Sequence, residues 1–206
     1  MARALFRKAL IGIALAAAAA PVAAQFKSEG FEFLEAVRDE DGQKVTDALN
    51  EPGSTIINTR DRTTGETALH IATTARNATW IRFFLQRGAN PNIADSKGVT
   101  PLMIAASVGD VDAVTALIKG GARIDVTNVT GETPLITAVH RRDLPIMKLL
   151  LEKGANPDKN DNSGRSARDY VALMNSNGAL LEVLAEHDTA EAAAGAAAQT
   201  YGPEIR

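Results

Sequence analysis

The chain repeats itself every 33 residues, and this interval constrains the fold more than any other feature of the sequence. Glycine recurs in this register as Gly65, Gly98, Gly131 and Gly164. A capping hydroxyl and a leucine recur with it, as Thr67, Thr100, Thr133 and Ser166, and as Leu69, Leu102 and Leu135. A unit of this length buries its apolar side only against its neighbours, so the sequence predicts a solenoid of stacked units.

Each unit contains the signals for two helices. In the second unit Thr100 is placed to cap a first helix, and Pro101 follows at the first helical position, where its missing N–H costs nothing. Asp110 is placed to cap a second helix, which Gly121 ends. The second cap recurs as Asn77, Asp110, Asp143 and Ser176. Each unit is therefore predicted to be a pair of helices joined by tight turns.

The residues of the second unit resemble the ankyrin repeat and its Thr-Pro-Leu-His-x-Ala signature. They are Gly98, Thr100, Pro101, Leu102, Ala105, Ala106 and Gly121. The first unit keeps the histidine, His70, which this family uses for hydrogen bonds between neighbouring units, whereas the next two units have Met103 and Ile136 there. Arg76 and Arg142 stand where the second unit has a glycine. The resemblance implies an all-α fold, an ankyrin-repeat solenoid of helix-turn-helix units with short hairpin-like connections.

The register also predicts how the chain is divided. A capping helix pair is expected at 25–61, full repeats at 62–94, 95–127 and 128–160, and a truncated last repeat at 161–187. In the capping pair Asp41 matches the second cap column. Residues 188–206 are rich in alanine and have little apolar surface to bury, so a disordered tail is expected there.

The first 24 residues have the three parts of a secretory signal peptide. Basic residues precede an uncharged apolar run at 9–20, and small residues at 22–24 offer a cleavage site before Gln25. The run is shorter than the roughly 20 residues that span a bilayer, and Pro21 interrupts it. We therefore expect cleavage and a periplasmic or secreted protein of a Gram-negative bacterium. An uncleaved membrane anchor and an organellar transit peptide are the alternatives.

The composition argues against several kinds of site. Without cysteine, the chain has no disulfide and no thiolate site. Cleavage of three basic residues and no acidic one changes the net charge from −3 to −6, which disfavours binding to nucleic acid or anionic lipid. His70, His140 and His187 lie at unrelated register positions, and no catalytic or phosphate-binding motif occurs. We therefore expect no enzyme, no cofactor and no metal site. The single tryptophan, Trp80, is expected to pack in the core, with an exposed aromatic anchor for a partner as the alternative.

The function is expected at positions that stacking does not explain. In ankyrin proteins the turn tips and the inner sides of the first helices form a concave face that holds other proteins. On this face the candidate contact residues are Ser96, Lys97, Val99, Met103, Ser107, Val108, Val129, Thr130, Glu132, His140, Arg141 and Arg165. They form an apolar centre with charged flanks, which suits a protein partner. For Met103 and Ile136, packing between repeats is the alternative.

The first hypothesis is a monomeric, non-enzymatic module that binds another protein through this face and does not insert stably into a membrane. The alternatives are an accessory or inhibitory subunit of a periplasmic enzyme, a weak hydrolase that uses His140 with an acidic neighbour, and a secreted effector. Activity measured on the purified protein and on a His140→Ala variant separates the hydrolase from the binding module.

Overall fold

The computed structural model describes residues 28–174 and 178–200, and this part of the chain holds ten α-helices, one short 3-10 helix and no strand. The helices are α1 (Glu29–Arg38), α2 (Gly42–Asn50), η2 (Ile56–Asn58, the 3-10 helix), α3 (Ala68–Thr74), α4 (Ala78–Gln86), α5 (Pro101–Val108), α6 (Val111–Lys119), α7 (Pro134–Arg141), α8 (Leu144–Glu152), α9 (Ala167–Leu173) and α10 (Gly178–Thr200). The predicted all-α class is confirmed.

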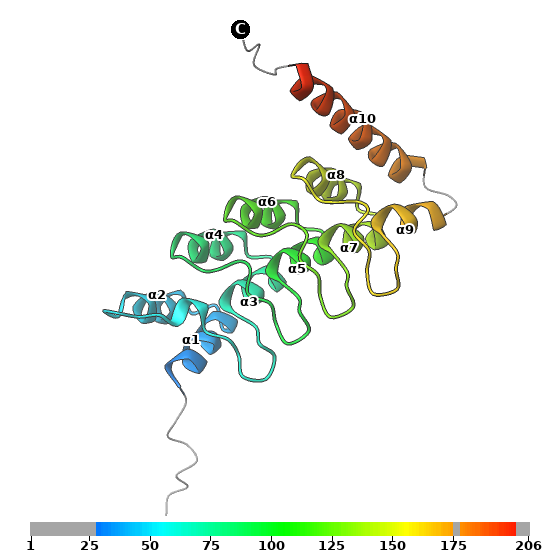
Figure 1. The fold of residues 1–206 in the computed structure, drawn as a ribbon. Helices are drawn as coiled ribbons and strands as arrows, with labels where there is room; N and C mark the ends of the chain where they lie inside the picture. The colour runs from blue at the N-terminus through cyan, green and yellow to red at the C-terminus, as the bar shows by residue number, and fades with distance from the viewer. Residues whose placement is uncertain (1–27, 175–177, 201–206) are drawn as a thin grey trace, which may run out of the picture.

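The helices form two rows (Figure 1). Helices α1, α3, α5, α7 and α9 make the inner row, beside which the long loops project, and α2, α4, α6, α8 and α10 make the outer row. Within one repeat the two helices pack on each other, as α5 does on α6. The inner helices also pack on their counterparts in the next repeat, as α5 does on α7, and so do the outer helices from α4 to α10. The solenoid of stacked helix-turn-helix units is therefore confirmed.

The predicted capping residues begin the helices. Thr100 Oγ1 accepts a hydrogen bond of 3.4 Å from the N–H of Met103 at the start of α5. Asp110 Oδ1 accepts one of 2.9 Å from the N–H of Ala113 at the start of α6. Equivalent bonds are accepted by Thr133, Asn77, Asp143 and, in the N-terminal pair, Asp41. Ser176, the last member of the second cap column, lies outside the described residues.

The ends of the inner helices require a left-handed backbone conformation, which glycine adopts at little cost. Gly109 has this conformation after α5, with a φ of 75°. Arg76 after α3 and Arg142 after α7 adopt it as well, with φ angles of 54° and 57°. The two arginines therefore preserve the turn geometry and carry the steric cost of a side chain in it.

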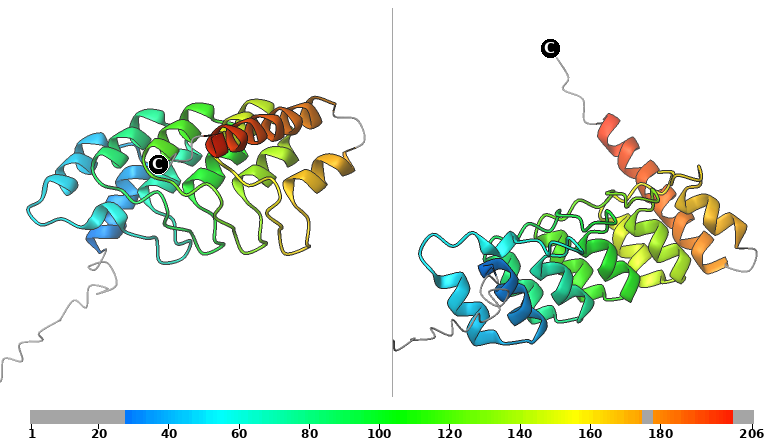
Figure 2. Two further views of the ribbon diagram at one scale, coloured as in Figure 1. Left: turned by 45° about the horizontal axis from the view of Figure 1, so that its top comes forward. Right: turned by 90° about the horizontal axis from the view of Figure 1, so that it is seen from below.

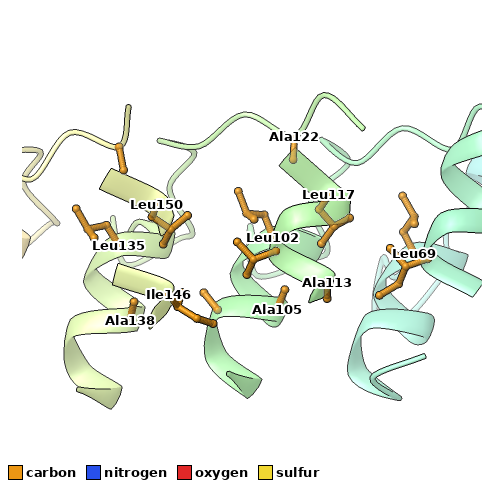
Figure 3. Close-up of a cluster of buried hydrophobic side chains, with 14 of the residues drawn as sticks. Leu69, Leu102, Ala105, Ala113, Leu117, Ala122, Leu135, Ala138, Ile146 and Leu150 are labelled. Atoms are coloured by element: carbon orange, nitrogen blue, oxygen red, sulfur yellow. The ribbon is translucent and has the colours of Figure 1, made fainter. Parts of the chain in front are cut away.

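A continuous core of leucine and alanine runs through the stack (Figure 3). Leu69, Leu102 and Leu135 come from three successive inner helices, and each is at most 1% exposed. Ala105 and Ala138 are also buried, and their small size lets neighbouring helices approach closely. Full burial of one leucine side chain contributes about 1.5–3 kcal/mol. The repeated leucine position therefore stabilises the stack without a disulfide.

Aromatic contacts join the N-terminal helix pair to the first repeat. Phe33 of α1 meets Phe84 of α4 edge to face, with ring centroids 6.3 Å apart. Trp80 packs on the same Phe84 ring at 5.4 Å, also edge to face. Trp80 thus packs against the core as expected from the sequence, although it is only partly buried, and the first helix pair covers the apolar end of the stack.

The structure differs from two expectations, one about a candidate contact residue and one about the C-terminal tail. Met103 is 4% exposed, so it belongs to the core rather than to the candidate contact surface, and Ile136 is buried in the same way. Both residues occupy the position of the signature histidine, from which His70 contacts the next repeat.

The second difference concerns the C-terminal tail. Helix α10 packs on α8 through Leu180, Val183 and Leu184 and then continues to Thr200, beyond the position where disorder is expected. Figure 2 shows its far half leaving the stack. Alanine has the highest helix propensity, and a helix that is already nucleated extends at little cost. None of the described helices, α10 included, is long and apolar enough to cross a membrane.

Candidate functional site

The loops between repeats end in turns of the same design. In the second repeat Asp95 Oδ1 accepts hydrogen bonds of 2.8 Å from the N–H groups of Lys97 and Val99. In the third, Asn128 Oδ1 accepts bonds of 2.9 Å from Thr130 and Glu132. One polar side chain therefore fixes each loop tip, and the two residues that follow it, Ser96 and Lys97 or Val129 and Thr130, are exposed.

Backbone hydrogen bonds join the loop tips into one row. They run from Ser96 N to Thr64 O, from Val129 N to Lys97 O and from Asn162 N to Thr130 O, with lengths of 2.8, 3.0 and 3.0 Å. Figure 1 shows the loops side by side along the inner row of helices. We call the surface formed by these tips and the exposed positions of the inner helices the concave face.

The structure places eleven of the twelve candidate residues at least partly in solvent. Those that are exposed are Ser96, Lys97, Ser107, Val129, Thr130, His140, Arg141 and Arg165, and those that are half-buried are Val99, Val108 and Glu132. Met103 is the exception, as described above. Val129 is the most exposed large apolar side chain of the described residues, at 64%. It lies at the tip of the third loop, in the middle of the row.

The structure also brings together an aromatic pair on this face. The His140 ring meets the Tyr170 ring edge to face, with centroids 4.5 Å apart. His140 Nδ1 lies 3.6 Å from Glu132 Oε1 on the neighbouring loop. Sequence reasoning selected His140 and Glu132 and missed Tyr170. The register gives only a weak signal for it, because Tyr170 is 33 residues after Thr137, at a half-buried position of the inner helices.

Tyr170 also connects the inner helix α9 to the last loop. Its hydroxyl donates a hydrogen bond of 2.6 Å to Asp161 Oδ2, while Ser163 Oγ donates one of 2.7 Å to Asp161 Oδ1. These hydrogen bonds, with the Tyr170 bond as the largest contribution, hold the pKa of Asp161 well below its usual range. Asp161 is therefore an ionised carboxylate whose oxygens are occupied by its own loop and by α9.

The glutamates of the face are engaged in a similar way. Glu66 Oε2 accepts a hydrogen bond of 3.1 Å from Thr64 Oγ1 and lies 3.7 Å from the Arg38 guanidinium. Glu132 Oε2 accepts one of 3.2 Å from Asn128 Nδ2. At the first loop, hydrogen bonds from the backbone N–H groups of Thr64 and Thr63, together with the bond from Arg38, lower the pKa of Asp61 to about 2.

The cations of the face have no such partners. Within the described residues, Lys97, Arg141 and Arg165 form no ion pair with a carboxylate. Arg141 lies over Gly109 of the preceding repeat, since a Cβ built on that glycine would come within 2.9 Å of Arg141 Nη2. The concave face thus combines unpaired cations with an exposed valine.

The surroundings of His140 are simple. Among the described residues no hydroxyl forms a hydrogen bond with its ring, and its neighbours are the Tyr170 ring edge and Glu132. In the same part of the chain, no group of three histidine, aspartate and glutamate side chains is placed to hold a metal ion.

Stacked helix pairs with a row of joined loop tips define a class of protein, the α-helical repeat proteins. The chain belongs to the ankyrin-repeat family: the family model described as "Ankyrin repeats (3 copies)" matches residues 33–128 and 107–194. No curated protein matches the chain. Ankyrin repeats are generally modules for protein–protein interaction and are typically non-enzymatic.

Proposed function

We propose that the protein is an exported, non-enzymatic module that binds a partner protein through its concave face. The observation that carries the proposal is the exposure of Val129 at 64%, on a row of loops whose cations Lys97 and Arg165 form no ion pair within the described residues. The helix caps, the repeated leucines and His70 stabilise the stack. The side chains of Val129 and of the unpaired cations contribute to neither the core nor the turns.

The chemistry of the face supports a protein as the partner. Protein interfaces have an apolar centre and a polar rim, and a few central side chains carry most of the binding energy. Val129 occupies the central position, with half-buried Val99 and Val108 on the neighbouring repeat. Lys97 and Arg165 lie on the loops to either side. Such a surface suits a protein better than a uniformly charged polymer.

Site-specific crosslinking in the cell tests the binding face. A photoreactive amino acid placed at Val129 is expected to crosslink to a discrete partner. The same residue placed at Lys119, which is exposed on the outer helix α6, is the matched control and is expected to give no such product. Equal yields of one product from both positions, or no product from Val129 while Lys119 reacts, would contradict the proposed face.

The export part of the proposal rests on residues 1–24, which lie outside the described residues. Its support is the sequence pattern of basic residues, apolar run and small residues before Gln25. Mass spectrometry of the protein from fractionated cells tests it. A chain that begins at Gln25 and is found outside the cytoplasm is the expected result, and an intact N-terminus on cytoplasmic protein would contradict it.

A further inference from the structure

We infer that the segment held by the concave face is an extended acidic peptide of the partner protein, with an apolar side chain between its carboxylates. This inference rests on the proposed function and adds the chemistry of the partner. It follows from three properties of the loop tips: which charges are free, where the charge of the chain lies, and how far apart the tips are.

The free charges on the loop tips are positive. Arg62 on the first loop, Lys97 on the second and Arg165 on the fourth are all exposed. In the described part of the chain, the side chains of these three residues have neither an ion pair nor a hydrogen bond. The third loop contributes the exposed apolar side chain of Val129 instead.

The negative charges of the same tips are already occupied. Asp95 and Asp161 accept hydrogen bonds from the N–H groups of their own turns, and Asp161 also accepts the Tyr170 hydroxyl. Glu66 faces Arg38, and Glu132 faces Asn128 and His140. A partner therefore meets cations that have no ion pair and carboxylates that are held in place by hydrogen bonds within the protein, and carboxylates on the partner would pair with these cations.

The distribution of charge along the chain favours the middle repeats over the ends of the stack. Residues 28–51 contain eight acidic and two basic residues, and residues 178–200 contain four acidic and no basic residues. Between them, residues 52–174 contain 15 basic and 12 acidic residues. Both ends of the stack therefore repel an acidic segment, while the middle repeats attract it. The negative net charge of the whole chain conceals this local preference.

The spacing of the repeats sets the length of the segment. Packed helices lie about 8–10 Å apart, so Lys97 and Arg165, two repeats apart, are separated by roughly 16–20 Å. An extended chain spans about 3.3 Å per residue, so two carboxylates about five or six residues apart reach both cations. Val129 lies on the loop between them, so the apolar residue of the segment is expected about midway.

A pair of synthetic peptides tests the inference on the purified protein. The acidic probe is a fluorescent peptide of about ten residues with two glutamates about five residues apart and a leucine between them. The control probe has glutamine at both positions. Fluorescence anisotropy is expected to show binding of the acidic probe, weakening as salt is added, and binding of the control probe weaker by about tenfold or more.

Charge reversal in the protein provides the second arm. Lys97→Glu with Arg165→Glu is expected to lower affinity for the acidic probe at least about tenfold and to confer binding to a peptide with lysines at the two positions. The matched control is Lys119→Glu with Lys153→Glu, which reverses two exposed cations at the C-terminal ends of the outer helices α6 and α8 and is expected to leave binding unchanged. Circular dichroism spectra verify that both variants fold.

The outcomes separate this inference from the proposed function. Equal binding of the two probes, no binding of either, or an unchanged affinity after the Lys97 and Arg165 reversal overturns the acidic partner. The crosslink from Val129 in the cell still supports a protein-binding face in that case. Self-association of the pure protein that disappears in the reversed variant would also overturn the inference, because the occupant would then be the acidic end of a second copy.

Discussion

The Nε2 atom of His70 donates a hydrogen bond of 3.0 Å to the carbonyl oxygen of Val99, which joins the first repeat to the loop of the second. The other ring nitrogen, Nδ1, accepts a bond of 3.1 Å from the backbone N–H of Thr67. These partners require a neutral ring with its proton on Nε2. His70 is 0% exposed, so both bonds lie in the core.

Replacement of His70 by alanine is expected to lower the free energy of unfolding by about 2–4 kcal/mol. The variant leaves a cavity and removes the buried partner of the Val99 carbonyl. Urea denaturation measures the effect. His140→Ala is the matched control: its ring is exposed and loses mainly the edge contact with Tyr170, so a change of at most about 1 kcal/mol is expected. Similar losses in the two variants would contradict the structural role of His70.

Stability is also expected to depend on pH through His70. Burial lowers the pKa of His70 below its usual value, because the charged ring would lose its solvation. The unfolded chain takes up this proton near pH 6.5 and the folded chain only at lower pH, so the free energy of unfolding falls as the pH drops below about 6.5. A His70→Gln variant has no imidazole to protonate and therefore lacks this contribution to the pH dependence.

Urea titrations at several pH values test this dependence. The difference in the free energy of unfolding between the wild type and His70→Gln is expected to narrow between about pH 7 and pH 5. Other groups that titrate in this range affect both chains alike. A difference that stays constant over the range would mean that His70 does not change its protonation between the folded and unfolded states.

Most of the fold could be predicted because stacking reuses the same few side chains in every unit. The hydroxyl of Thr100, the carboxylate of Asp110 and the buried Leu102 each have one local task, and the 33-residue register reveals it. The helical continuation of α10 to Thr200 could not be predicted from that register, since the alanine-rich segment leaves the repeat and forms its helix by propensity.

At one helix end the sequence has an arginine where glycine would fit the backbone conformation better. Arg142 has a φ of 57° after α7, a conformation that costs a residue with a side chain about 1–2 kcal/mol. Arg142→Gly is therefore expected to raise the free energy of unfolding by about 0.5 kcal/mol or more, once the greater freedom of glycine in the unfolded chain is subtracted. Thermal unfolding followed by circular dichroism measures the shift.

Arg141→Gly is the control for that substitution. Arg141 is the last residue of α7, where glycine lowers helix stability by about 1 kcal/mol relative to a good helix former. The two variants remove the same kind of side chain from adjacent positions, and opposite signs are expected. Destabilisation by both would show that the left-handed conformation carries no cost at Arg142.

The candidate surface could be predicted only in part, and Met103 shows why. The register identifies which positions lie near the concave face, but whether a side chain turns outward depends on the space between repeats, which the neighbouring helices decide. Met103→Ala is expected to lower the free energy of unfolding by about 2–3 kcal/mol, because it empties a packed position. Ser107→Ala, exposed on the same helix, is expected to change it by less than about 0.5 kcal/mol. Equal changes in the free energy of unfolding for the two variants would mean that Met103 is not packed in the core.

Tyr170 is the contact on the concave face that required the structure, because its partner Asp161 is fixed by the loop and not by the helix register. Tyr170→Phe removes the hydroxyl that donates to Asp161 Oδ2 and keeps the ring against His140. The pKa of Asp161 is expected to rise, since that hydrogen bond is the largest cause of its low value. An NMR titration of the Asp161 carboxyl carbon measures the change. Ser163→Ala removes the next largest contribution and is expected to give a smaller rise, and an unchanged midpoint in Tyr170→Phe would mean that α9 does not hold the last loop through this bond.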